Sequence, residues 1–477
     1  MNRYVAALMF SAFAVLFITP VVLHGQQLSI ESAIEILQNN SNPIKQAGKG
    51  VEIAKAGKQK LNAAWYPFIT VTGAYVHFSN KIEAKESIKE LAEPVTEIIP
   101  DLSEIIGPIG NYTFSFPLLD QNVSTIDAAI VWPVFTGGKR IYANRIGKSA
   151  VESASLLEQI TTESQIVQLI ECYYAAKLSR EIVTVMQENL QAMEKLYNNA
   201  NRLLENGVIT KAEMLVAKVA WQQAQNELSG AKNNDSIALN SLFTLLNIEQ
   251  PQDTGILFVS PFFMCSSLPN KEAFKPIIAT ANPGIRLIEQ RKSIAANEKK
   301  IAQSSYLPTI AAFGKQNLYS YNIPSNLSPS NVIGATFTWN IFDGFNREKS
   351  TEIAQQEYEN LEIEKNQAID NLYLLTDKLY MQLSDAQMNL KTITVSIELA
   401  AELVKIREKS FKEGMATSTD VVNANVELAK MRTAAATAYF RYDTALSALL
   451  ALCNESKRFT NYINRNDNII YKSLTSY

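Results

Sequence analysis

Histidine and cysteine are scarce in this chain of 477 residues, which has only two histidines and three cysteines. Cys172, Cys265 and Cys453 have no metal-ligand spacing, and the sequence has no nucleophile elbow, phosphate-binding loop or paired loop carboxylates. Because catalysis needs groups of these kinds, we expect no enzyme activity, no metal site and no cofactor. Cys172 and Cys453 are expected to pack between helices, and a Cys265 to Cys453 bridge stays open as an alternative.

An excess of one charge and a membrane-spanning apolar run are also missing. The net charge is −3, which gives no electrostatic case for nucleic-acid binding. The apolar run from Tyr4 to Ile18 follows Arg3 and precedes Pro20, and it is too short to span a membrane. It predicts a secretory signal peptide over residues 1–25, removed after Gly25. Since no cysteine lies near this point, a lipid anchor is not expected.

Helix breakers are missing from two long stretches. Proline is absent from residues 134–250 and from residue 331 onward. Gly207 is the only glycine between Gly147 and Gly230, and Gly414 is the only glycine after Gly344. A run of roughly 60 to 70 residues without a breaker predicts a helix about 90 to 100 Å long. We therefore expect two very long helices, each followed by a turn and a return helix.

The two stretches are copies of each other. A shift of 207 positions carries Trp132 onto Trp339 and Gly207 onto Gly414. The same shift aligns Phe135 with Phe342, Gly137 with Gly344, Arg140 with Arg347, Tyr173 with Tyr380, Thr210 with Thr417, Leu242 with Leu449 and Asn247 with Asn454. One offset kept over more than a hundred residues indicates an internal duplication.

Heptad spacing predicts that each copy is an antiparallel helical hairpin. In the first return helix the seam is interrupted once, at Asp235, and consists of Met214, Ala217, Trp221, Ala224, Leu228, Ala231, Asp235, Ala238, Leu242 and Leu245. In the second it is unbroken and consists of Val421, Ala424, Leu428, Met431, Ala435, Ala438, Tyr442, Ala445, Leu449 and Leu452. The many alanines allow the two backbones of a hairpin to approach closely.

Each copy also contains two strand signals, at residues 68–79 and 125–135 in the first and 309–321 and 332–342 in the second. The second strand of each pair has one apolar face that ends in tryptophan, formed by Ile126, Ala128, Ile130, Trp132 and Val134 or by Ile333, Ala335, Phe337, Trp339 and Ile341. This pattern is typical of a lipid-facing barrel strand, and a half-buried strand of a soluble sheet is the alternative. Because four strands cannot close a barrel, the membrane interpretation requires several chains.

These signals divide the chain into five segments. They are the signal peptide 1–25, a first repeat 26–250 with its hairpin at 138–247, a linker 251–271, a second repeat 272–454 with its hairpin at 346–453, and a polar tail 455–477. The first repeat also inserts roughly thirty-five residues, from about Lys81 to Pro117, between its strands, as barrels with long outer loops do. The linker and the tail are expected to form short elements outside the main bundle.

Taken together, these features resemble the TolC family of outer-membrane efflux and secretion channels over nearly all of the mature chain. The most specific motifs are the two turns, residues 206–213 (NGVITKAE) and 413–420 (EGMATSTD), and the strand ends that begin at Trp132 and Trp339. The resemblance implies a mainly α-helical fold with a membrane β-barrel contribution. It also implies a trimer with a twelve-stranded barrel, a periplasmic helical tunnel, no cofactor and no catalysis. The implied partners are outer-membrane lipid, a periplasmic adaptor and an inner-membrane pump of the RND or ABC type.

The same resemblance suggests site residues at the two turns. The tips that would dock the adaptor are Gly207, Val208, Thr210, Gly414, Met415 and Thr417. The periplasmic entrance or gate would be formed by Asp420, Asn423 and Glu213, and three copies of Asp420 near one axis would raise the carboxylate pKa of some copies. The chain departs from the family in having Asn423 in place of a second acid and Met415 and Ala416 in place of a basic latch residue.

Two functions fit these patterns. The first is a passive trimeric exit duct for efflux or type I secretion. The second is a periplasmic coiled-coil scaffold that binds partners and forms no channel. Only the first requires the apolar strand faces to meet lipid, so extraction of the mature protein from membranes by carbonate would exclude it. The sequence does not indicate the transported substrate, the pump or the resting state of the gate.

Overall fold

A computed structural model describes residues 27–87, 89, 90, 93, 111, 113–249, 257–267, 269–324 and 329–471. The predicted signal peptide lies outside these residues, as does most of the middle of the insertion at 81–117. The chain folds into two compact units, unit 1 (residues 1–46, 159–282 and 370–477) and unit 2 (residues 47–158 and 283–369). No helix in the described part of the chain has the length and apolar character that crossing a membrane requires.

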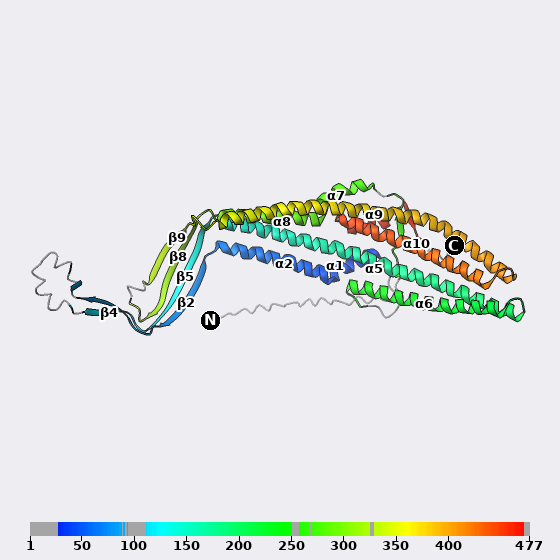
Figure 1. Cartoon of the computed structure of the whole chain (residues 1–477), viewed down its shortest axis with the longest axis horizontal. Coiled ribbons are helices and arrows are strands. Elements are labelled where there is room, and N and C mark those ends of the chain that lie inside the picture. Colours follow the sequence, from blue (N-terminus) through cyan, green and yellow to red (C-terminus); the bar gives the residue numbers. More distant parts are fainter. Residues whose placement is uncertain are drawn as a thin grey trace, which may run out of the picture. The chain divides into compact units, whose positions relative to one another are not determined.

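Four long helices form the two predicted hairpins (Figure 1). They are α5 (Lys139–Glu205), α6 (Lys211–Leu246), α9 (Asn346–Lys412) and α10 (Ser418–Leu452). Helices α5 and α9 each have 67 residues, and both ends of α9 lie at the positions that the 207-residue shift predicts. At about 1.5 Å per residue each is about 100 Å long, which confirms the predicted helices.

The heptad seams lie inside the hairpins, as the spacing predicts. Every seam residue of α6 and α10 is buried or half-buried, and Ala217, Leu242, Tyr442 and Leu449 are completely buried. The interruption at Asp235 has a partner. Arg180 Nε lies 3.1 Å from Asp235 Oδ2, and the Ser179 hydroxyl donates to Oδ1 at 3.0 Å. The seam therefore keeps its charged residue because α5 supplies an ion pair and a hydrogen bond to it.

The sequence suggested that the linker and the tail lie outside the main bundle, but parts of both pack in the core of unit 1. Their described parts contain β6 (Leu257–Phe258), β7 (Phe263–Cys265), α11 (Phe459–Ile463) and β10 (Asn468–Ile470). Phe262, Phe263 and Phe459 are completely buried and pack in the core of unit 1 with α1 (Ile30–Asn40) and α7 (Phe274–Ala281). These apolar side chains require burial, so the two segments belong to the core.

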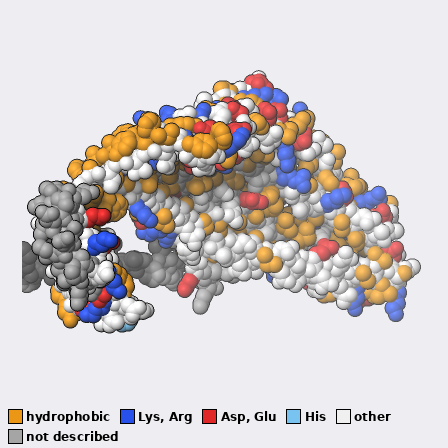
Figure 2. Space-filling model, turned by 60° about the vertical axis from the view of Figure 1, so that its left-hand side comes forward, with side chains coloured by type: hydrophobic (Ala, Val, Ile, Leu, Met, Phe, Trp, Pro, Cys, Tyr) orange, Lys and Arg blue, Asp and Glu red, His pale blue; other side chains and the backbone are white. Residues whose placement is uncertain are grey.

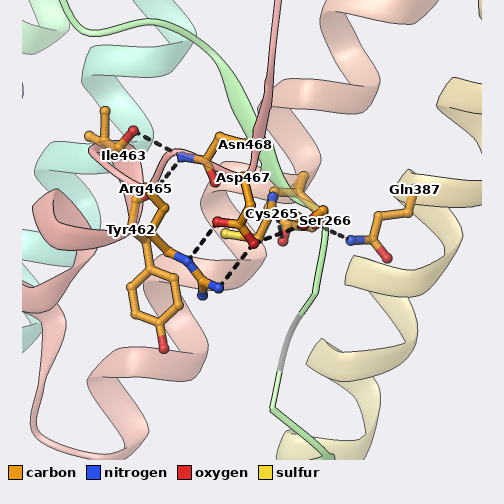
Figure 3. Close-up of polar contacts among 9 residues, drawn as sticks. Cys265, Ser266, Gln387, Tyr462, Ile463, Arg465, Asp467 and Asn468 are labelled. Carbon is orange, nitrogen blue, oxygen red and sulfur yellow. Dashed lines mark hydrogen bonds and ion pairs between the residues drawn. The ribbon is translucent and has the colours of Figure 1, made fainter.

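Polar contacts hold the tail against the linker. Strands β10 and β7 pair antiparallel. Asp467 accepts from Arg465 at 3.1 Å and from the Ser266 hydroxyl at 2.8 Å, and Gln387 of α9 donates to the Cys265 carbonyl at 2.8 Å (Figure 3). Cys265 and Cys453 are both buried free thiols, so the alternative of a bridge between them is wrong. Burial raises the pKa of the Cys453 thiol to about 11.

A four-stranded antiparallel sheet dominates unit 2 (Figure 1). Its order is β2 (Phe68–His77), β5 (Asn122–Thr136), β8 (Thr309–Tyr321) and β9 (Asn331–Thr338). All four predicted strands exist, although β9 ends at Thr338 and not at 342. The insertion contains an unexpected hairpin of β3 (Ile82–Ser87) and β4 (Thr113–Leu119).

One face of this sheet is apolar and uncovered. The register of β2, β5, β8 and β9 brings together on it the predicted apolar faces of β5 and β9 and the alternate residues Ile69, Val71 and Tyr75 of β2. Exposure reaches 73% for Ile69 and 90% for Ile333. Figure 2 shows hydrophobic side chains gathered on the surface of the strands. In water such an exposed apolar face would promote aggregation, so it favours a lipid environment for this sheet.

The strand-to-helix junctions are built identically in the two repeats. Trp132 Nε1 donates to the Trp65 carbonyl at 3.1 Å, and Trp339 Nε1 donates to the Tyr306 carbonyl at 3.0 Å. An arginine at the start of each long helix lies over the ring of the residue whose carbonyl accepts this bond. The Arg140 guanidinium is 4.3 Å from the centroid of the Trp65 ring, and the Arg347 guanidinium is 4.7 Å from that of Tyr306. Strand β2 is preceded by α2 (Asn42–Asn62) and the short 3-10 helix η1 (Ala63–Trp65). Strand β8 is preceded by α8 (Pro283–Ser304).

Asp443 of α10 is an ionisable group in the core of unit 1. It is completely buried, and neither carboxylate oxygen has a hydrogen-bond partner among the described residues. Burial raises the pKa of Asp443 well above its usual value, against the smaller opposing effects of the Phe263 amide and the Lys177 ammonium. Burial also lowers the pKa of Lys177, whose Nζ donates to the Ser260 carbonyl at 2.6 Å. The core therefore favours the neutral acid.

The raised pKa of Asp443 predicts a stability that declines with pH. A carboxyl whose pKa is higher in the folded state contributes its stability below the unfolded pKa of about 3.9 and loses it as pH rises toward the folded value. Replacing Asp443 by Asn should remove this loss, so that the thermal midpoint at pH 8 exceeds that of the wild type. The gain amounts to about 1.4 kcal/mol per unit of pKa shift inside the pH range. Identical pH dependence of the midpoint in both proteins would contradict this.

Candidate functional site

The candidate site consists of the two hairpin tips in unit 1, where the residues singled out from the sequence lie. Gly207 and Gly414 have left-handed φ angles of +70° and +72°. After Gly207, the Val208 amide donates to the Leu203 carbonyl at 2.9 Å. After Gly414, the Met415 amide donates to the Ser410 carbonyl at 2.8 Å. This pattern satisfies the last carbonyls of each long helix and reverses the chain. Glycine is needed here because other residues seldom adopt this conformation.

A threonine begins the return helix at each tip. Thr210 accepts from the Glu213 amide at 3.4 Å. Thr417 makes the reciprocal arrangement with Asp420, because its hydroxyl accepts from the Asp420 amide at 3.2 Å and its own amide donates to the Asp420 carboxylate at 3.0 Å. Both thus satisfy first-turn amides that lack a partner in the helix. Thr210 and Thr417 are therefore the N-caps of α6 and α10.

The predicted docking residues are all at the surface. Gly207, Thr210, Gly414 and Thr417 are exposed, and so are Val208 at 53% and Met415 at 72%. Each tip therefore presents one apolar side chain beside a polar turn. A valine and a flexible methionine at the ends of two hairpins can serve as small apolar contacts for another helical protein.

The two tips contact each other. Glu213 of the first hairpin accepts from the Ser418 amide, the first residue of α10, at 2.7 Å. Lys195 and Glu408 form a second link between the hairpins at 3.7 Å. The partial positive charge at the start of α10 favours the Glu213 carboxylate. Glu213 and Asp420 occupy equivalent positions, but Asp420 closes its own cap whereas Glu213 reaches the other hairpin.

Asp420 and Asn423, the other predicted entrance residues, have surroundings different from those of Glu213. Asp420 lies 3.7 Å from Arg407 of α9, and Asn423 is exposed. Hydrogen bonds from the Thr417 amide and hydroxyl, with a smaller effect of Arg407, lower the pKa of Asp420. In a single chain the acid is therefore held ionised, and the rise expected for a ring of copies would have to overcome these bonds.

Arg407 and Ser418 were missed by reasoning from the sequence. Arg407 occupies a seam position of the second hairpin where the other copy has Ala200, and a charge on an apolar stripe could have signalled a nearby partner. Ser418 acts through its backbone amide, for which a sequence carries no signal. The described residues also hold no group of three or more His, Cys, Asp or Glu side chains arranged for a metal ion.

Comparison with known proteins identifies the family. A family model described as "Outer membrane efflux protein" matches residues 33–247 and 278–455. This chain belongs to the outer membrane efflux protein family. The gap between the two matched segments contains β6 and β7, and each matched segment contains two strands of the four-stranded sheet and one long hairpin. The family places the protein in the outer membrane with a periplasmic extension.

Relatives and solved structures agree with this assignment. The chain is 21% identical over 316 residues to the alkaline protease secretion protein AprF of Pseudomonas aeruginosa, and the aligned part spans 64% of this chain and 65% of AprF. Its fold is similar to the outer membrane protein VceC of Vibrio cholerae (TM-score 0.67, 16% identity, 88% of this chain and 96% of VceC). It is also similar to the outer membrane channel CmeC of Campylobacter jejuni (TM-score 0.68, 13% identity, 91% and 89%). The resemblance to TolC-like channels is confirmed for the fold.

Proposed function

We propose that this outer membrane efflux protein is a passive exit duct for export. Three copies would share one barrel in the outer membrane and continue as a helical tunnel into the periplasm. The duct would dock on a periplasmic adaptor that is linked to an inner-membrane pump, and it would catalyse nothing. The duct would serve efflux or type I secretion, and the relative AprF is named as a secretion protein for an alkaline protease.

The uncovered apolar face of the four-stranded sheet is the observation that carries this proposal. The face runs across all four strands, and both edge strands, β2 and β9, lack a partner on one side among the described residues. Unpaired backbone groups are costly in lipid, and four strands are too few to close a barrel. Several copies that share one barrel satisfy both requirements. The scaffold alternative leaves the apolar face and both edges unexplained.

The hairpin tips are the proposed adaptor-docking site. Val208 and Met415 are the exposed apolar side chains there, on turns that Gly207 and Gly414 shape. Two tips per copy around a three-fold axis would present six apolar contacts. Each tip offers only a small surface, so a single contact would be weak. Several equivalent contacts to one adaptor assembly would together bind more tightly, as in multivalent binding.

The proposed entrance lies beside these tips, at Glu213, Asp420 and Asn423. The Glu213 bond to the Ser418 amide holds the first hairpin to the second, so breaking it would let the tips separate. Asp420 is ionised through its cap, which would give an entrance of three copies a negative ring. Such a ring attracts cations.

Channel recording in planar bilayers tests the duct directly. The purified protein should produce long-lived conducting events with cation selectivity, because charged entrance residues line a continuous water path. Asp420→Asn should reduce the cation selectivity and the block by multivalent cations. Asp385→Asn, a change at another acid of the second hairpin, is the matched control. A protein that inserts into membranes without conducting would contradict the duct, and unchanged selectivity would limit Asp420 to its cap.

Charged substitutions at the tips test adaptor docking. Val208→Lys combined with Met415→Lys should abolish export by intact cells, since two apolar contacts per copy become repelling charges. Channel conductance in bilayers should stay unchanged, because the turns and caps remain. Lys211→Ala, a change at a neighbouring exposed residue, is the control. Full export by the double variant would contradict docking at these side chains.

A further inference from the structure

The four strands of the sheet contain one acidic and one basic side chain. Within β2, β5, β8 and β9, Asp127 is the only Asp or Glu, and Lys315 is the only Lys or Arg. His77, the last residue of β2, is the only histidine in these strands. A charge on the lipid face of a barrel strand is destabilising, whereas a charge on the inner face influences which ions pass. The face on which Asp127 and Lys315 lie therefore decides what they can do.

Asp127 and Lys315 both lie on the face of the sheet opposite the apolar one. Successive residues of a strand point to opposite faces, so Asp127 lies on the other side of the sheet from Ile126. On β8, Asn317 lies directly opposite Asp127. Lys315 lies opposite Ala129, which is on the same face as Asp127. If the apolar face meets lipid, as in the proposed duct, Asp127, Lys315 and Asn317 line the interior of the barrel.

The two charges neutralise each other across the β5–β8 seam. Lys315 Nζ lies 3.0 Å from Asp127 Oδ2, and the Asn317 side-chain amide donates to Asp127 Oδ1 at 3.0 Å. Both carboxylate oxygens of Asp127 thus have a partner on β8. The Asp127 side chain is 17% exposed and that of Lys315 is 48% exposed. Because the opposite charges are so close, their fields largely cancel at distances well beyond their separation.

The charged pair occurs in only one of the two repeats' strand positions. The 207-residue shift carries Asp127 of β5 onto Gly334 of β9. Counted from the proline that precedes each strand, Lys315 of β8 corresponds to Ala74 of β2. Neither counterpart carries a charge. A duct of three copies would therefore hold three such carboxylates and three such ammonium groups in its barrel strands, and each carboxylate would have its ammonium partner in the same copy.

We propose that Lys315 keeps the barrel section of the duct neutral, so that this section does not select cargo by the sign of its charge. The inference rests on the proposed function and adds a specificity-determining residue to it. Without Lys315, three Asp127 carboxylates would form an acidic ring inside the barrel, in addition to the proposed ring of Asp420 at the entrance. Such a ring favours cations and retards anions. With Lys315 in place, the barrel admits cargo of either sign and charge selection is left to the entrance.

Salt concentration decides how far an unpaired charge on the barrel wall acts. The Debye length is about 10 Å at 0.1 M salt and about 3 Å at 1 M. An unpaired Asp127 carboxylate would therefore influence ions well inside the barrel in dilute salt, and only those next to the wall in concentrated salt. An electrostatic effect of Lys315 should thus disappear at high salt, whereas a change in the shape of the pore should persist.

Reversal potentials across planar bilayers in a KCl gradient test the pair, with about 0.1 M salt on the concentrated side. Lys315→Gln should shift the reversal potential toward higher cation selectivity, because it leaves the carboxylates unpaired. Asp127→Asn should shift it in the opposite direction, because it leaves the ammonium groups unpaired. The double variant should return to the wild-type value. Lys315→Arg keeps the charge at the same position, so this matched control should leave the reversal potential unchanged.

Unit conductance in about 1 M salt shows whether each variant forms an intact pore, since the unpaired charges are screened there. Selectivity shifts that persist in this salt, or shifts of both single variants in one direction, would overturn the inference. Unchanged reversal potentials in conducting single variants would overturn it while leaving the duct intact. If one single variant does not insert, the direction of the other still decides. A wild-type protein that inserts without conducting would overturn the proposed function as well.

Discussion

Backbone hydrogen bonding in lipid is the constraint on which the rest of this structure depends. The sheet β2-β5-β8-β9 exposes an apolar face and leaves one edge of β2 and one edge of β9 unpaired. A bilayer offers no water to satisfy those edges, and in the proposed duct another copy would do so. In each repeat the long helix follows the second strand of the pair directly along the chain. The alanine-rich seams keep each hairpin narrow, as the proposed path between copies would require.

The two repeats share the same architecture and differ in a few side-chain contacts. Both junctions keep the tryptophan bond and the arginine over an aromatic ring, at Trp132 with Arg140 and at Trp339 with Arg347. The sequences of the two repeats differ at the hairpin tips and at the start of the long helices. Glu213 crosses to the other hairpin whereas Asp420 closes its own cap, and the chain has Phe345 where the first repeat has glycine. Glu213 therefore joins the two hairpins, whereas its counterpart Asp420 does not.

Periodic features were predictable from the sequence, and features that depend on single long-range contacts were not. The seams, the four strands and the tip glycines followed from spacings of 3.5 and 2 residues and from helix breakers. The core position of Phe262, Phe263 and Phe459 was missed, because short apolar segments have no periodicity that indicates which surface they pack against. The contacts of Glu213 with Ser418 and of Arg407 with Asp420 were missed because each joins residues that only the folded hairpins bring together.

The central claim is that the exposed sheet is one third of a closed barrel. Electron cryo-microscopy of the protein extracted from outer membranes in detergent tests it most directly. The account predicts a three-fold ring in which twelve strands form a continuous barrel and each long helix extends about 100 Å from it. A particle with an open four-stranded sheet, or a closed ring with another number of copies, would contradict it.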